Sequence, residues 1–311
     1  MKEKILITGA AGFIGSNLAA RLLKEGYQVA GIDNLAYGLR ENVPDGVEFH
    51  ERDIRDSGIY SLFEGIDAVF HLAAKNCISD CQADPIETAD INVTGTVIVF
   101  EAARRAEVRK IIYAESSALY EGSALLPTPE SVVQPESFYA VSKFAGMHFA
   151  EAYKRYYGMI FTALRYFCVY GPVQDYRRTI PPVMSAFIIK LLKGERPIIY
   201  GKGDKRRDFV YVDDVNDFHL LCLRDSRTDN ETFNLGSGEN HSVLEIYELV
   251  SQLLGVRLEP EFKPDFPGEA QMTLANISKA SALGWKPKTE LQAGLLHAVD
   301  YIKSEMAAGK I

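Results

Sequence analysis

The sequence has little of several features that would point to particular classes of protein. Its 311 residues include only four cysteines and one tryptophan, so a fold built on disulfides is not expected. Basic residues number 34 against 42 acidic ones, giving a formal net charge of −8. This balance offers no basic surface to nucleic acid or an anionic membrane, and no apolar run is long enough to span a bilayer.

The chain enters the apolar run Ile5-Leu6-Ile7 almost at once. Because this leaves no room for a signal peptide, we expect a cytoplasmic protein. Cys77 and Cys81 form a C-x3-C pair, a spacing compatible with a metal or redox site. No second ligand cluster lies nearby in the sequence, so we favour buried or idle thiols and expect no metal.

The most informative motif is the glycine-rich segment that runs from Thr8 to Gly15, with glycines at 9, 12 and 15. It follows a predicted strand and precedes a predicted helix. Asp33 comes directly after the next apolar run. A strand, a glycine turn and a helix N-terminus in this order form a site for the pyrophosphate of a dinucleotide.

The first half of the chain alternates β-rich apolar runs with helical stretches, as in a parallel sheet covered on both faces. The pattern predicts strands at 4–8, 28–32, 47–50, 67–71, 110–114 and 160–165, and helices near 13–26, 58–64, 85–106 and 137–157. After Gly171 the alternation breaks into short elements separated by proline and glycine. We therefore predict an α/β fold with a doubly wound parallel sheet at 1–166 and a smaller α/β lobe at 167–311, from which some segments return to the sheet.

Tyr139 and Lys143 lie four residues apart on a predicted helix and so share one face. A neighbouring ammonium favours the phenolate of a tyrosine, which can then act as a general base toward a hydroxyl. Ser116 follows the strand at 110–114, at the sheet edge where α/β proteins hold ligands. A hydroxyl there can bond the reacting oxygen, although Ser117 is a close alternative and either serine can simply be solvated.

Further motifs extend from end to end and together resemble the extended short-chain dehydrogenase/reductases, with a Rossmann-type fold, and in particular their nucleotide-sugar 4-epimerases. Beside the glycine turn and Tyr139-x3-Lys143, they are Asp33-Asn34-Leu35, Asp53-Ile54-Arg55-Asp56, His71-Leu72-Ala73-Ala74, Asn92-Val93-Thr94-Gly95-Thr96, Leu164-Arg165-Tyr166-Phe167, Val169-Tyr170-Gly171-Pro172, Arg207-Asp208-Phe209-Val210-Tyr211 and Leu283-Gly284-Trp285-Lys286-Pro287.

The resemblance implies NAD as the cofactor, because a carboxylate at Asp33 accepts from the adenosine ribose and repels a 2′-phosphate. It implies Ser116, Tyr139 and Lys143 as the catalytic trio, with Tyr139 and Lys143 also touching NAD. The other cofactor-binding residues it implies are Gly9, Gly12, Phe13, Ile14, Gly15, Asp33, Asn34, Asp53, Ile54, Leu72, Ala73, Ala74 and Asn92.

For the substrate, the resemblance implies a nucleotide sugar, most simply UDP-linked, contacted by Ser116, Tyr139, Cys168, Arg178, Arg207, Glu269 and Thr273. Cys168 stands where the family usually has asparagine, and Phe266 where it has an arginine for the diphosphate. Arg177 or Arg178 is a candidate replacement for that cation, against the alternative of a solvated surface arginine. Thr273 is small at a position that limits the group on C2 of the sugar, which leaves room for an N-acetyl group.

The implied reaction is epimerisation at C4 through a 4-keto sugar. The 4,6-dehydratases of the superfamily carry an Asp-Glu pair after the active-site hydroxyl, where this chain has Ser117 and Ala118. Glu115 leaves open an atypical elimination. A net oxidation or reduction, and a non-catalytic NAD-binding regulator, are also compatible with the sequence.

We also expect a homodimer if the apolar stripe of Phe144, Met147, His148 and Ala152 pairs with a second subunit, although that stripe can equally cover the sheet.

Overall fold

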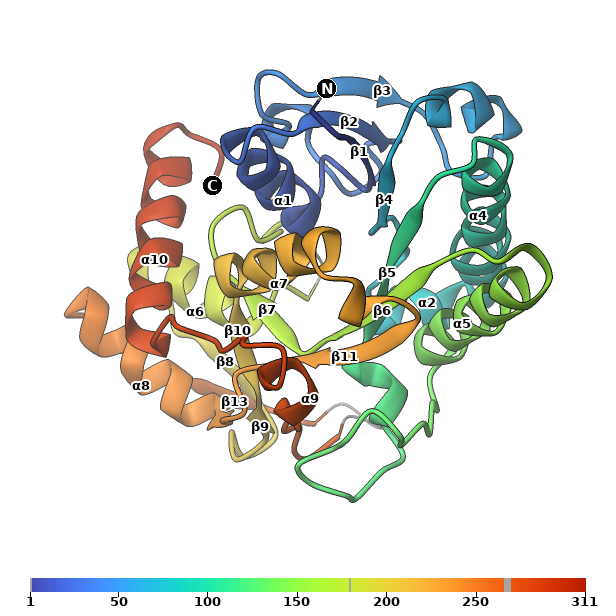
Figure 1. Cartoon of the computed structure of the whole chain (residues 1–311). Helices are drawn as coiled ribbons and strands as arrows, with labels where there is room; N and C mark the ends of the chain where they lie inside the picture. Colours follow the sequence, from blue (N-terminus) through green and yellow to red (C-terminus); the bar gives the residue numbers. More distant parts are fainter. Residues whose placement is uncertain (1, 179, 266–269) are drawn as a thin grey trace. The chain divides into compact units, whose positions relative to one another are not determined.

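The computed structural model describes residues 2–178, 180–265 and 270–311 (Figure 1). The chain divides into two compact units. The first comprises residues 1–124, 130–166 and 216–234, and the second comprises residues 125–129, 167–215 and 235–311. Each unit is described by itself.

A seven-stranded parallel sheet forms the centre of the first unit, in the order β11-β6-β5-β4-β1-β2-β3. Its strands are β1 (Lys4–Thr8), β2 (Gln28–Asp33), β3 (Glu48–Glu51), β4 (Ala68–His71), β5 (Lys110–Ser116), β6 (Phe161–Tyr166) and β11 (Glu231–Leu235). The first six match the predicted strands to within two residues at each end. The predicted α/β fold with a Rossmann-type sheet is therefore confirmed.

Helices lie on both faces of this sheet because alternate strand residues point to opposite sides. Tyr113 and Phe161 pack with Phe100 on the face of α4 (Thr96–Arg105) and α5 (Phe138–Tyr157), which lie beside each other in Figure 1. On the opposite side, Phe70 contacts His219 of α7 (Val212–Arg224). An Arg21–Asp217 ion pair of 2.8 Å joins α7 to α1 (Phe13–Lys24).

Two predicted helices of the first unit differ in detail from the expectation. The helix near 58–64 is the 3₁₀ helix η2 (Ser57–Phe63), which Asp56 caps by accepting from the Gly58 amide. The helix at 85–106 consists of α3 (Pro85–Ala89), the π-helical η3 (Asp90–Gly95) and α4. A π segment widens one turn of a helix and is common at functional sites. The remaining helices are η1 (Arg40–Asn42), α2 (Ile78–Ala83), η4 (Ser117–Tyr120) and η5 (Ser226–Thr228).

The second unit consists of short strand pairs and helices. Its parallel pairs are β10 (Phe209–Tyr211) with β7 (Cys168–Tyr170) and β13 (Glu261–Lys263) with β8 (Ile198–Tyr200). β12 (His241–Ser242) pairs with β9 (Arg206–Arg207) in antiparallel fashion. The helices are α6 (Val183–Leu192), α8 (Val243–Leu254), α9 (Ser278–Ser281) and α10 (Leu291–Ala307), of which α6 packs against α8 and α10. No helix in the described parts of the chain is long and apolar enough to cross a membrane.

Candidate active site

The glycine turn lies between β1 and α1 and depends on the absence of side chains. A Cβ atom on Gly15 would lie 2.1 Å from the Gly9 carbonyl oxygen, and one on Gly9 would lie 2.9 Å from the Ala73 amide nitrogen. Gly12, the N-cap of α1, supplies no side-chain hydrogen bond to the first helical turn. An anion such as a pyrophosphate can therefore come close to the free backbone amides of that turn.

Asp33 ends β2 beside this turn. Its carboxylate accepts hydrogen bonds from the amide of Ala11 at 3.0 Å and from the amide of Leu35 at 2.8 Å. Burial raises the pKa of Asp33, and these two bonds oppose the increase. Because each oxygen keeps a free lone pair, the fixed carboxylate can still accept from ribose hydroxyls.

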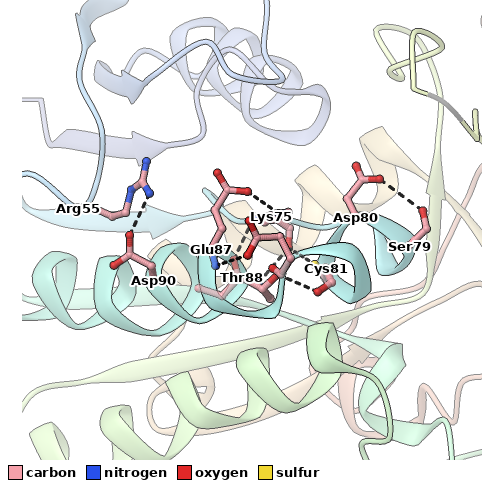
Figure 2. Close-up of polar contacts among 10 residues, drawn as sticks. Arg55, Lys75, Ser79, Asp80, Cys81, Glu87, Thr88 and Asp90 are labelled. Atoms are coloured by element: carbon pink, nitrogen blue, oxygen red, sulfur yellow. Dashed lines mark hydrogen bonds and ion pairs between the residues drawn. The ribbon is translucent and has the colours of Figure 1, made fainter.

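Asn34 and Asp53 are joined by a hydrogen bond of 2.9 Å at the ends of neighbouring strands. Arg55 bonds Asp53 at 2.7 Å and holds its pKa at about 2, so Asp53 is an anion at neutral pH. Arg55 also reaches Asp90 in η3 at 3.0 Å (Figure 2). The structure therefore brings Asn34 and Asp53 together, whereas their contact with a cofactor, like that of Ile54, stays a prediction.

The segment after β4 runs alongside the glycine turn, since the backbone of Leu72 and Ala73 is the nearest neighbour of Gly9. His71, just before it, lies between the hydroxyl of Thr8 at 2.7 Å and that of Thr96 at 2.9 Å. Burial lowers the pKa of His71 well below its usual value, so the ring is neutral. The sequence presents His71 only as part of a motif, because its bridging role depends on three separate elements.

Asn92 is fully buried in η3 and fixes the loop after β4. Its amide group accepts from the Lys75 amide at 2.8 Å and donates to the Lys75 carbonyl at 2.9 Å. It also donates to the hydroxyl of Ser142 in α5 at 2.9 Å. Asn92 therefore holds the turn of α5 that carries Tyr139 and Lys143, and its predicted place near the nicotinamide stays a prediction.

Lys75 is one of the buried residues of the cluster in Figure 2. Its ammonium pairs with Glu87 of α3 at 2.5 Å, and the thiol of Cys81 donates to the Lys75 carbonyl at 3.4 Å. Cys81 is buried and Cys77 half-buried, and both are free thiols. Among the described residues, no group of three or more His, Cys, Asp or Glu side chains is placed to hold a metal ion.

The proposed catalytic residues come from β5 and α5. Ser116 ends β5, and its hydroxyl accepts from the Ala118 amide at 3.1 Å. Tyr139 and Lys143 lie one turn apart near the start of α5, which Ser137 caps through the Ala140 amide. Tyr139 is half-buried, whereas Lys143 is buried.

Lys143 is held against β5 by close packing. Its ammonium lies 4.4 Å from the centre of the Tyr113 ring, and the Tyr113 hydroxyl donates to the Lys143 carbonyl at 3.0 Å. A Cβ atom on Gly146 would lie only 2.2 Å from that hydroxyl, so glycine allows the helix this close to the strand. Burial lowers the pKa of Lys143 to about 8.

Glu115 and Arg165 form a buried ion pair that the sequence did not predict. Arg165 of β6 contacts the Glu115 carboxylate of β5 at 2.8 Å, in register with the strand pairing. The Glu115 side chain has no exposed surface, which argues against the elimination considered for it from the sequence. The signal in the sequence that could have indicated this pair was a charged residue within an otherwise apolar strand.

Three of the predicted substrate residues are neighbours in the second unit. The Cys168 amide donates to the Asp208 carbonyl at 3.0 Å, and the Asp208 amide donates to the Thr273 hydroxyl at 3.2 Å. Arg207, the last residue of β9, directly precedes Asp208. Cys168, Arg207 and Thr273 are all half-buried.

Arg178 is also half-buried, and its guanidinium lies 3.5 Å from the Asp175 carboxylate. Asp175 also contacts the exposed Arg177 at 3.1 Å. Glu269 and the neighbouring Phe266 lie outside the described residues. The roles of all these residues toward a substrate stay predictions.

Comparison with known proteins adds to this geometry. The model of the family described as "NAD dependent epimerase/dehydratase family" matches residues 5–236. A putative UDP-glucose 4-epimerase of Methanocaldococcus jannaschii is 37% identical over 304 residues, which cover 96% of this chain and 98% of the relative.

Two solved structures share the fold with a TM-score of 0.94. One is the UDP-glucose 4-epimerase of Thermotoga maritima with UDP-glucose, 35% identical over 97% of this chain and 99% of that one. The other is the UDP-N-acetylglucosamine 4-epimerase of Methanobrevibacter ruminantium with UDP-N-acetylmuramic acid, 29% identical over 98% of this chain and 100% of that one.

Proposed function

The chain belongs to the NAD-dependent epimerase/dehydratase family, and from this premise we propose that it is a UDP-sugar 4-epimerase. The single observation that carries the proposal is the Tyr139–Lys143 pair, in which the ammonium is buried against β5 in the unit that contains the glycine turn. The three proteins compared above match this chain along nearly their whole length. Each of them is described as a UDP-sugar 4-epimerase, in one case a putative one.

The residues present fit NAD. The glycine turn leaves space that a Cβ atom would fill, and Asp33 ends the second strand with a carboxylate beside it. When bound, NAD supplies reversible acceptance of a hydride from the sugar carbon. We infer that Gly9, Gly12 and Gly15 bind the pyrophosphate and that Asp33 accepts from the adenosine ribose.

Tyr139 is the residue that transfers the proton. Lys143 places a positive charge one helical turn away, and a nearby cation favours the phenolate over the phenol. Tyr139 then takes the proton of the C4 hydroxyl, and Ser116 hydrogen-bonds the same oxygen. Loss of this proton, together with loss of the C4 hydride that NAD would accept when bound, gives a 4-keto sugar, which must turn before the hydride returns to its other face.

We propose further that the sugar includes 2-acetamido forms as well as plain hexoses. Thr273 is small, and its hydroxyl accepts from the Asp208 amide at 3.2 Å. Its side chain is therefore fixed against the backbone, and it takes less room than a larger side chain would at this position. The variant Thr273→Tyr is expected to lower kcat/KM for UDP-N-acetylglucosamine more than for UDP-glucose. An equal effect on both substrates would contradict the proposal, and Thr273→Ser is the matched control.

The test of the function is to incubate the protein and NAD with UDP-glucose, UDP-N-acetylglucosamine and UDP-glucuronic acid, and to separate the products by chromatography and mass. An isomer of unchanged mass supports epimerisation. A loss of water would instead indicate a dehydratase. NAD binding without any turnover would favour the non-catalytic regulator.

A further inference from the structure

Glu115 is a buried carboxylate that the mechanism above does not use. It is the penultimate residue of β5, two positions after Tyr113 and therefore on the same face of the strand. One oxygen, Oε2, accepts from Arg165 Nε at 2.8 Å. The other, Oε1, is buried and has no hydrogen-bond partner within the described residues. One oxygen of the carboxylate is thus held by Arg165, and the other is enclosed by the protein without a hydrogen bond.

Arg165 is itself fixed, so Glu115 has a defined position. Arg165 Nη1 donates to the Tyr120 hydroxyl at 3.0 Å and to the Glu130 carbonyl at 2.7 Å. A charge in such a rigid, water-free position acts strongly on its neighbours because little solvent screens it. The Glu115 carboxylate therefore presents a fixed negative charge on the face of β5 that Tyr113 shares, and the paired Arg165 offsets part of it.

Lys143 is the cation on that face on which this charge can act, since its ammonium lies over the Tyr113 ring. The titratable groups around it come from three elements. They are Tyr113 and Glu115 of β5, His71 of β4, which is neutral, and Tyr139 one turn earlier in α5; a fourth element, β6, contributes Arg165, which pairs with Glu115. Burial lowers the pKa of Lys143 to about 8, and the charge of Glu115 opposes that decrease.

We propose that Glu115, held in place by Arg165, is a positioning residue that keeps the buried Lys143 in its ammonium form. The proposal rests on the proposed function only in assuming that the charge of Lys143 serves catalysis. Without Glu115, no carboxylate among the described residues is placed beside this ammonium to offset its burial. Lys143 then loses its proton at a lower pH, and with it the charge that favours the phenolate of Tyr139.

The direct test is to titrate Lys143 by NMR in the NAD-free protein, with carbon-13 in the lysine side chains and with Lys143→Arg to assign the signal. We expect Glu115→Gln to lower the pKa of Lys143 and Glu115→Asp to restore most of it. An unchanged pKa in Glu115→Gln would overturn the proposal. This readout needs no turnover, so it stands whether or not the protein is an epimerase.

Glu115→Gln leaves Arg165 buried without its anion and can lower the stability of the fold. The double variant Glu115→Gln/Arg165→Met removes both charges and keeps the test possible, with a lower pKa of Lys143 still expected but a smaller decrease than in Glu115→Gln. The matched control is Asp229→Asn, which removes the partner of another buried lysine of β5, Lys110. It should lower the melting temperature and leave the titration of Lys143 unchanged.

The second readout is the dependence of kcat on pH. In Glu115→Gln the alkaline limb should move to lower pH, so that activity near pH 8 falls roughly threefold to tenfold more than activity at the optimum. A uniform decrease with unmoved limbs would show a merely structural role and overturn the proposal. If no variant turns over UDP-sugars while Lys143 shifts as expected, the proposed function fails and the electrostatic role remains.

Discussion

The two units of the chain hold their predicted functional residues in different ways. In the first unit, Lys143 is buried between β5 and α5, and the Glu115–Arg165 pair lies within the sheet. In the second unit, Cys168, Arg178, Arg207 and Thr273 are only half-buried. A group enclosed in this way can have its charge tuned by its surroundings, whereas a half-exposed group chiefly contributes contacts. We infer that the reaction depends on the first unit and the choice of substrate on the second.

Among substitutions that test this difference between the two units, the largest effect on activity is expected at Tyr139. Replacing it by phenylalanine removes the proposed base and leaves the ring, so kcat should fall by about 10³-fold. The melting temperature and the affinity for NAD should stay close to those of the unaltered protein. The measurement is turnover of UDP-glucose and UDP-N-acetylglucosamine beside a thermal melt. Full activity in Tyr139→Phe would exclude the mechanism.

The next largest effect is expected at the glycine turn. Gly15→Ala places a methyl group against the Gly9 carbonyl, which should cost about 1–3 kcal/mol of stability and weaken NAD binding. Ala20→Gly, at an exposed position of the same helix, is the matched control, because it should cost about 1 kcal/mol without affecting NAD. Denaturant unfolding and calorimetric titration with NAD separate the two effects. Unweakened NAD binding in Gly15→Ala would contradict the predicted pyrophosphate site.

Acid should act on the first unit through its neutral histidines. Burial lowers the pKa of His219 from 6.5 to about 3 and that of His71 well below 6.5. Below about pH 6.5 the unfolded chain therefore binds more protons than the folded one, and the free energy of unfolding falls as the pH falls. Each histidine contributes up to about 1.4 kcal/mol per pH unit.

The variant His219→Phe isolates this contribution. Its free energy of unfolding, measured in urea between about pH 6 and 4, should depend on pH less steeply than that of the unaltered protein. His297→Phe, at an exposed position of α10 in the second unit, is the matched control and should leave the slope unchanged. Equal slopes in all three proteins would show that acid does not act through His219.

The smallest expected effect lies in the second unit, at Arg178. If its guanidinium contacts the substrate diphosphate, Arg178→Ala should weaken binding of UDP about tenfold and reduce the dependence of that binding on salt. Arg257→Ala removes an exposed arginine of the same unit, paired with Glu248 at 2.8 Å, and should change neither. Titration calorimetry at two salt concentrations decides this. Unaltered affinity and salt dependence in Arg178→Ala would identify it as a surface arginine.

Local patterns in the sequence were sufficient for most of the first unit. The six predicted strands are present because apolar runs between turn residues have few alternatives in a parallel sheet. The seventh, β11, was not predicted, since its five residues follow a region in which the alternation had already broken. The helix near 58–64 is a 3₁₀ helix because Asp56 caps a tight first turn.

Local sequence was enough to predict the glycine turn, the first six strands of the sheet and the Tyr139–Lys143 spacing, because each depends on residues close together in the chain. The environment of Lys143, in contrast, arises from the packing of elements that are far apart in the chain. Tyr113, Glu115 and Arg165 come from two neighbouring strands, and their effect depends on burial and on distances that no local pattern encodes. Charges act much more strongly over such distances where water is excluded, and water is excluded here once the sheet and its helices have packed together.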